Sequence, residues 1–85
     1  MISYSFSVHA DRQLRKLPEA EQRRVILKLT HYLGSPHPLQ YAKRMKGTRG
    51  PVYRFRIDPY RVIFDWLGEA ILVTKVGHRR DVYRT

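Results

Sequence analysis

Arginines are the residues of this sequence whose type and spacing best fit a chemical task. Arg54 and Arg56 alternate with apolar residues in the run Val52–Ile57, and Arg61 lies near the start of the next alternating run. A guanidinium group donates paired hydrogen bonds to phosphate oxygens, and its pKa is too high for it to act as a base. This pattern predicts a surface that binds phosphodiesters and stabilises charge on them.

Proton transfer needs other side chains, and two candidates lie near the end of the chain. His78 carries an imidazole with a usual pKa of about 6.5, and Tyr83 could donate a proton or orient a water. With such groups an enzyme can cleave RNA without a metal, because the 2′-hydroxyl of RNA attacks the adjacent phosphate. Two alternatives stay open: His78 and Tyr83 are equally typical of surface or packing positions, and a basic surface can simply bind RNA.

The sequence lacks the residues that several other kinds of chemistry require. The sequence has no cysteine, which excludes disulfides, cysteine-ligated zinc, iron–sulfur clusters and cysteine nucleophiles. No two of its four histidines have the helical spacing of a zinc site, and neither a glycine-flanked serine nor a phosphate-binding glycine loop is present. We therefore expect no metal and no cofactor.

Charge is the strongest compositional signal. The chain holds 17 Lys and Arg against 7 Asp and Glu, a net charge of +10, which predicts a polyanionic partner. The excess peaks between residues 35 and 57, with six basic residues and no acid. A solvated basic face is the alternative interpretation. The expected RNA-binding residues are Lys43, Arg44, Lys46, Arg49 and Arg80.

The elements that would position these residues are helices followed by strands. Ile2–Val8 alternates apolar and polar residues, which predicts a strand with one buried face. Residues 10–34 carry apolar residues three and four apart, broken at Pro18, which predicts a helical hairpin. Residues 35–51 are rich in proline and glycine and predict mainly loop.

The second half of the sequence predicts strands. Val52–Ile57 and Tyr60–Trp66 alternate around the turn dipeptide Asp58-Pro59. Ala70–Val76 is nearly continuously apolar, which is typical of a central strand covered on both faces. Gly77 would interrupt this strand, and a short strand or tail would follow it.

Helices and strands are segregated along the chain, which indicates an α+β fold. We expect a single domain over residues 1–85, with an N-terminal strand, a helical hairpin and an antiparallel meander of three or four strands. The helices would cover one sheet face, and Arg54, Arg56 and Arg61 would lie on the other. No membrane span or secretion signal is recognisable, so we expect a cytoplasmic protein without membrane contact.

The order of these motifs resembles the RelE/ParE toxin superfamily. The combination of Tyr-Arg-Val-Ile and, later, Val-Gly-His-Arg is its most specific part, and the sequence is closer to the RelE branch than to the ParE branch. The likeness covers nearly the whole chain through the Leu17-Pro18 joint of the hairpin, Lys43–Gly47, Val52–Ile57, Tyr60–Phe64 and Val76–Arg84.

The resemblance implies a small microbial RNase-like fold and a toxin of a type II toxin–antitoxin system. RelE-type toxins cut mRNA in the ribosomal A site through its 2′-hydroxyl, and an antitoxin wraps and inactivates them. We therefore expect a ribosome-dependent endoribonuclease, or mRNA interferase, whose partners are a cognate antitoxin, the ribosome and mRNA. The alternatives are a non-enzymatic gyrase inhibitor like ParE and a catalytically weakened toxin that binds antitoxin or nucleic acid.

The resemblance also assigns residues. The paired basic residues of the family fall on Arg54 and Arg56, its central arginine on Arg61, a later arginine on Arg79 and its late tyrosine on Tyr83.

Some family members have lysines in place of Arg54 and Arg56. The pKa of a lysine can fall far enough for it to accept a proton, whereas that of an arginine scarcely can. Three alternatives therefore stay open for the general base: His78, a water, or no efficient base. The expected catalytic residues are Arg54, Arg56, Arg61, His78, Arg79 and Tyr83.

Overall fold

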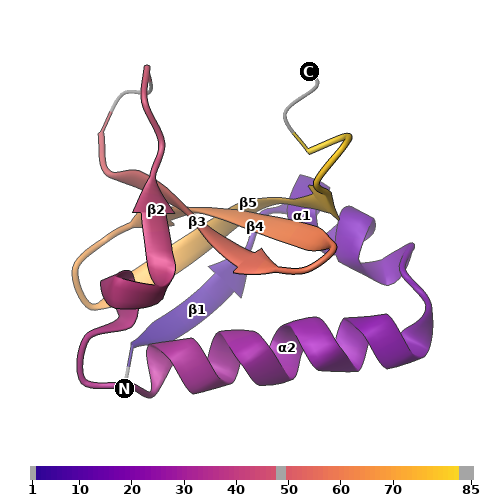
Figure 1. The fold of residues 1–85 in the computed structure, drawn as a ribbon, viewed down its shortest axis with the longest axis horizontal. Coiled ribbons are helices and arrows are strands. Elements are labelled where there is room, and N and C mark those ends of the chain that lie inside the picture. Colours follow the sequence, from indigo (N-terminus) through magenta and orange to yellow (C-terminus); the bar gives the residue numbers. More distant parts are fainter. Residues whose placement is uncertain (1, 48–49, 83–85) are drawn as a thin grey trace.

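A computed structural model of the chain describes residues 2–47 and 50–82 (Figure 1). Two predicted site residues, Arg49 and Tyr83, lie outside the described residues. The elements in chain order are strand β1 (Ser3–Phe6), helices α1 (Val8–Arg15) and α2 (Glu19–Leu33), the 3₁₀-helix η1 (Pro38–Tyr41), and strands β2 (Ala42–Arg44), β3 (Val52–Ile57), β4 (Tyr60–Trp66) and β5 (Ala70–His78).

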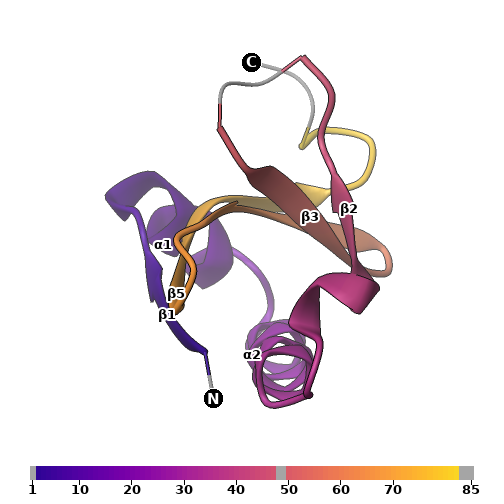
Figure 2. The ribbon, with the colours of Figure 1, turned by 90° about the vertical axis from the view of Figure 1, so that its left-hand side faces the viewer.

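The strands form one mixed sheet in the order β1-β5-β4-β3-β2. Strands β2 to β5 pair antiparallel with their neighbours, whereas β1 runs parallel to β5. Strands β1 and β2 therefore form the two edges of the sheet (Figure 2). The predicted α+β class and the antiparallel meander over residues 52–78 are confirmed, and β2, from the segment predicted to be mainly loop, adds a fourth antiparallel strand.

The hairpin of two helices is also confirmed, with small shifts at its ends. The Ser7 hydroxyl accepts a hydrogen bond from the amide of Ala10 at 3.1 Å and caps α1. Pro18 stays extended (ψ 145°), so α2 begins one residue later than predicted, and Gly34 caps its other end. No helix in the described part of the chain is long and apolar enough to cross a membrane.

The core lies between the helices and one face of the sheet. Phe55 and Phe64 stack at its centre, with ring centroids 4.5 Å apart. This covered face fixes the strand register, because a slip by one residue would expose its apolar side chains. The buried side chains of the core are Ala10, Leu14, Val25, Leu29, Leu33, Phe55, Ile57, Val62, Phe64, Ile71, Val73 and Val76.

Three sequence predictions were wrong in detail. The segment predicted to be mainly loop contains η1 and β2. Ala42–Arg44 forms a strand because it pairs with β3, and a three-residue segment is too short for the sequence pattern to predict that long-range contact. Strand β5 lies between β1 and β4, but its second face is only partly covered, with Leu72 half-buried. It also continues through Gly77, whose lack of a side chain lets Val82 approach to 3.4 Å from where a Cβ would lie.

Candidate functional site

The uncovered face of the sheet gathers the predicted arginines. Arg56 pairs with Arg61 across β3 and β4, and Lys43 pairs with Arg54 across β2 and β3. Because paired residues point to the same face, these four cations share the side away from the core. Figure 2 shows α2 on one side of the sheet and the described residues that follow β2 on the other. We call this side the open face.

Arg61 is the least accessible of these cations. Its side chain is 10% exposed, and Nη1 donates to Asp58 Oδ1 at 2.8 Å and to the Tyr60 carbonyl at 3.0 Å. Arg56 has a side chain that is 68% exposed, and its Nε donates to the same Oδ1 at 3.4 Å. A single carboxylate therefore holds two arginines at the end of the β3–β4 hairpin.

Asp58 is a residue of the site that the sequence interpretation treated only as part of a turn. Chiefly the hydrogen bond from Arg61, and secondarily the hydrogen bond and charge of Arg56, lower the pKa of the Asp58 carboxyl below its usual value. The group is therefore ionised at neutral pH and fixes the Arg61 guanidinium. The sequence does contain a signal for this pair: Asp58 lies in the turn between two strands, three residues before Arg61.

Two backbone contacts fix the turn that carries Asp58. Arg24 of α2 donates from Nη2 to the Asp58 carbonyl at 2.7 Å, while it also pairs with Glu21 at 2.8 Å. The amide of Arg79 donates to the Pro59 carbonyl at 2.8 Å. The second contact brings exposed Arg79 to the same end of the sheet as Arg61.

His78 does not join the arginines of the open face. Residue 74 forms a bulge, since Val73 pairs with Phe64 but Lys75 pairs with Ile63. This extra residue inverts the alternation of β5, so that His78 pairs with Tyr60 on the covered face. The two rings meet edge-on at 6.3 Å, and His78 Nδ1 accepts from the amide of exposed Arg80 at 3.1 Å.

Two further predicted RNA contacts, Arg44 and Lys46, lie at the β2 edge. A shallow cavity of about 250 Å³ is lined by Lys43, Arg44, Met45, Lys46 and Arg54. Arg44 pairs with Tyr53, with its guanidinium 6.0 Å from the centre of that ring, so it lies toward the covered face. The other cations of this cavity continue the open face toward the β2–β3 loop.

Metal-binding side chains are dispersed in the described ranges. Among residues 2–47 and 50–82, no three His, Cys, Asp or Glu side chains come close enough together to hold a metal ion.

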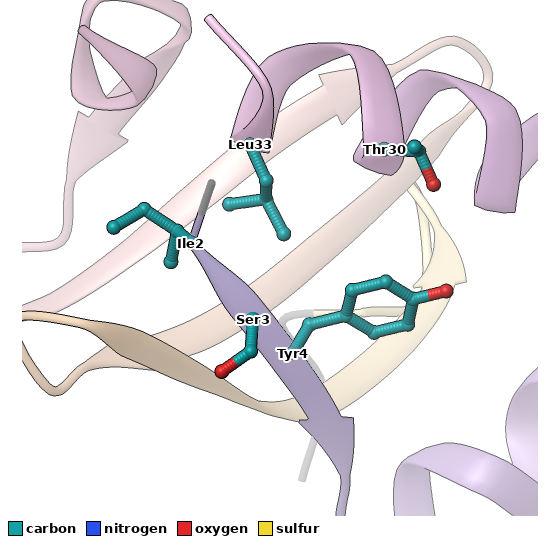
Figure 3. A pocket seen from close by; sticks show the side chains of 5 residues that line it. All are labelled: Ile2, Ser3, Tyr4, Thr30 and Leu33. Atoms are coloured by element: carbon teal, nitrogen blue, oxygen red, sulfur yellow. The ribbon is translucent and has the colours of Figure 1, made fainter. Parts of the chain in front are cut away.

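The β1 edge is apolar instead of basic. A hollow of about 290 Å³ lies between β1 and the end of α2, lined by Ile2, Ser3, Tyr4, Thr30 and Leu33. Figure 3 shows the Ile2 and Leu33 side chains beside each other and the Tyr4 ring extending across the hollow. Tyr4 is 39% exposed, so part of this apolar surface faces solvent.

Comparison with known proteins identifies a family and a fold. The family model described as the ParE toxin of type II toxin–antitoxin systems, parDE, matches residues 4–83. No curated protein sequence matches the chain.

Solved structures match over nearly all of the chain. The RelBE2 toxin–antitoxin complex from Mycobacterium tuberculosis has a TM-score of 0.75 at 21% identity, covering 92% of this chain and 98% of that one. The RelE–RelB complex from Pyrococcus horikoshii OT3 has a TM-score of 0.71 at 25% identity, with coverages of 94% and 97%. The intact RelBE complex from E. coli has a TM-score of 0.73 at 22% identity, with coverages of 92% and 96%.

Proposed function

This chain belongs to the family of ParE toxins of type II toxin–antitoxin systems, and from that premise we propose that it is a ribosome-dependent mRNA endonuclease. In this proposal residues 1–85 act as one toxin domain in the cytoplasm, where the toxin cuts mRNA in the ribosomal A site. The observation that carries the proposal is the cluster of arginines on the open face, with Arg61 fixed by Asp58 at 2.8 Å.

The proposed reaction uses groups of the RNA and of the open face. The 2′-oxygen of one nucleotide attacks the adjacent phosphorus, the bond to the 5′-oxygen breaks, and a 2′,3′-cyclic phosphate and a 5′-hydroxyl result. One proton leaves the 2′-hydroxyl and one reaches the departing 5′-oxygen. Arg61 and Arg79 stabilise the charge that develops on the phosphoryl oxygens, while Arg54 and Arg56 hold the RNA.

Proton transfer in this proposal involves Tyr83, His78 or a water. The bulge at residue 74 turns His78 toward Tyr60, so a role for His78 requires RNA that reaches around the end of β5. Comparing mRNA cleavage by His78→Gln and by Arg61→Ala therefore tests whether His78 carries a proton. A large loss of cleavage in both variants supports that role, whereas a loss in Arg61→Ala alone contradicts it.

The proposed protein partner is an antitoxin. The structural relatives are toxin–antitoxin complexes, and the net charge of +10 favours an acidic partner. We propose that an apolar segment of the antitoxin docks at the hollow between β1 and α2, because burial of Tyr4 and Ile2 would remove apolar surface from water.

A second candidate function follows from the identity of the matching family. Because that family is described as ParE toxins, a ParE-like inhibitor of gyrase is the alternative to a nuclease. A catalytically weakened toxin that binds antitoxin or nucleic acid is a further alternative, supported by arginine in place of lysine at positions 54 and 56.

Brief, tightly controlled expression followed by primer extension on a defined mRNA separates these functions. The nuclease predicts cuts within translated codons that disappear when translation is blocked. Growth arrest with intact mRNA and damaged DNA would instead indicate a gyrase inhibitor. Intact mRNA with normal growth would overturn the nuclease and favour the weakened toxin.

A further inference from the structure

A second cavity at the β2 edge combines an aromatic ring with several cations. Its volume is about 260 Å³. No acidic side chain is among the described residues that line it. The lining residues are Gln40, Tyr41, Ala42, Lys43, Arg54 and Arg56.

Tyr41 is held in place at this cavity by other aromatic residues. Its ring stacks on Tyr32 of α2, with centroids 4.7 Å apart and an interplanar angle of 20°. The ring centroid of Tyr32 in turn lies 4.9 Å from that of buried Phe55, and the ring centroid of His31 lies 6.1 Å from that of Tyr41. Despite these contacts Tyr41 remains 40% exposed. Because Tyr32 takes one ring face, a flat ligand would stack on the other face of a ring that is already fixed.

The cations of the cavity continue directly into the proposed catalytic face. Arg54 pairs with Lys43 on one side of β3, and Arg56 pairs with Arg61 on the other. Neighbouring strands lie about 4.8 Å apart, which places β2 about 10 Å from β4. An extended RNA with its reacting phosphate at Arg61 would therefore bring a neighbouring nucleotide to this cavity.

We propose that the cavity is a nucleotide subsite, in which Tyr41 stacks a base of single-stranded RNA and Lys43, Arg54 and Arg56 bind the phosphate beside it. The side-chain amide of Gln40, which both donates and accepts hydrogen bonds, lies where it can contact the edge of that base. This inference rests on the proposed function and deepens it. An acidic peptide would use the cations but leave the aromatic face without a role, whereas a nucleotide uses both.

Binding of an uncleavable RNA tests the subsite without any need for catalysis. The probes are a short, fluorescently labelled 2′-O-methyl RNA and the same backbone with abasic sites, compared by anisotropy at constant salt. We expect the unaltered protein to prefer the oligonucleotide with bases by about tenfold, and Tyr41→Ala to lose most of that preference. Tyr41→Phe, which keeps the stacking ring, should retain the preference.

Tyr4→Ala is the matched control, because Tyr4 is exposed to the same degree (39% against 40%) at the opposite edge of the sheet. We expect it to leave both affinities unchanged, whereas Lys43→Ala should weaken both oligonucleotides equally. Circular dichroism of Tyr41→Ala checks the fold, and Tyr41→Leu, an apolar side chain without a flat ring, should lose the preference as well.

The outcomes separate the subsite from the function on which it rests. If the unaltered protein binds both oligonucleotides equally, or if Tyr41→Ala and Tyr41→Leu keep the preference, the subsite is wrong while RNA binding stands. If the protein binds neither oligonucleotide, the subsite fails, and primer extension on translated mRNA then decides separately whether the proposed nuclease fails as well. Displacement of both oligonucleotides by an acidic peptide, with no effect of Tyr41→Ala, would assign the cavity to a protein partner.

Discussion

The two edges of the sheet present tyrosines of nearly equal exposure in opposite surroundings. Tyr4 on β1 is 39% exposed and extends across an apolar hollow, whereas Tyr41 beside β2 is 40% exposed and adjoins three cations. The same side chain therefore belongs to a surface suited to a protein partner at one edge and to nucleic acid at the other. The exposed fraction alone does not distinguish the two tyrosines, whereas the residues around them do.

This separation has a functional consequence. An antitoxin segment at the β1 edge and RNA at the β2 edge would contact different residues, although both edges rest on the same core. Substitutions can therefore abolish one interaction and leave the other, unless they reach the core that supports both.

A change in the core should eliminate the difference between the edges. Phe55 is fully buried and touches both Tyr32, which supports Tyr41, and Phe64. We expect Phe55→Ala to lower the free energy of unfolding by about 3–5 kcal/mol, measured by chemical denaturation, because it leaves a cavity. Leu27→Ala, at a position 70% exposed, is the control and should change stability by less than about 0.5 kcal/mol. A Phe55→Ala protein as stable as Leu27→Ala would contradict this account of the core.

Loss of the central arginine should abolish activity and leave the β1 edge intact. We expect Arg61→Ala to reduce mRNA cleavage at least about 100-fold, because the charge on the reacting phosphate loses its nearest fixed donor. Binding of the cognate antitoxin, measured in parallel, should persist. Arg15→Ala, which removes an exposed pair with Asp11 on α1, should leave cleavage unchanged. Equal cleavage by Arg61→Ala and Arg15→Ala would exclude the assigned role.

A charge at the apolar edge should have the opposite selectivity. We expect Tyr4→Asp to weaken antitoxin binding by about tenfold or more, because a carboxylate would enter an apolar interface without a partner. Affinity for the 2′-O-methyl RNA should stay the same. Calorimetric titration with the antitoxin provides the measurement, and weakened RNA binding with normal antitoxin binding would reverse our assignment of the two edges.

A single lysine at the β2 edge should have a smaller effect. Lys43→Ala should reduce the slope of log affinity against log salt for RNA by about one, as expected when one phosphate contact is lost. Antitoxin binding through β1 should not change. An unchanged salt slope would place Lys43 outside the RNA path.

Removing the ion pair between Asp58 and Arg61 should have the smallest effect, a change in thermal stability that depends on pH. The pKa of Asp58 is lowered in the folded chain, so its ionised form stabilises the fold above about pH 4, the usual range of an aspartate. That contribution disappears as the pH falls through the lowered pKa. We expect the Tm difference between the unaltered protein and Asp58→Asn to shrink between pH 7 and pH 3. The same difference at both pH values would contradict the pairing.

Local patterns in the sequence were sufficient to predict which arginines share the open face, but not to predict the two edges of the sheet. Alternation in β3 and β4 placed Arg54, Arg56 and Arg61 together because those strands pair in a regular register. Alternation could not have placed His78 on either face, because the extra residue at position 74 inverts the alternation of β5 and leaves no mark in the sequence.

Contacts between segments that are distant in the chain account for the other features that the sequence did not predict. The short strand β2 exists only through its pairing with β3, and Tyr41 gains its position from Tyr32 of α2. A single sequence shows neither contact. The Asp58–Arg61 pair is closer in the chain, but it depends on the geometry of the turn between β3 and β4.

Cleavage of programmed ribosomes by the purified chain tests the central claim most directly. The mRNA is used in two forms, one entirely ribose and one with a 2′-deoxy nucleotide immediately before the expected cut in the A-site codon. The account predicts cleavage of the first form, ending in a 2′,3′-cyclic phosphate, and none of the second at that position. Cleavage of both forms, or of neither by a folded protein that arrests growth, would contradict it.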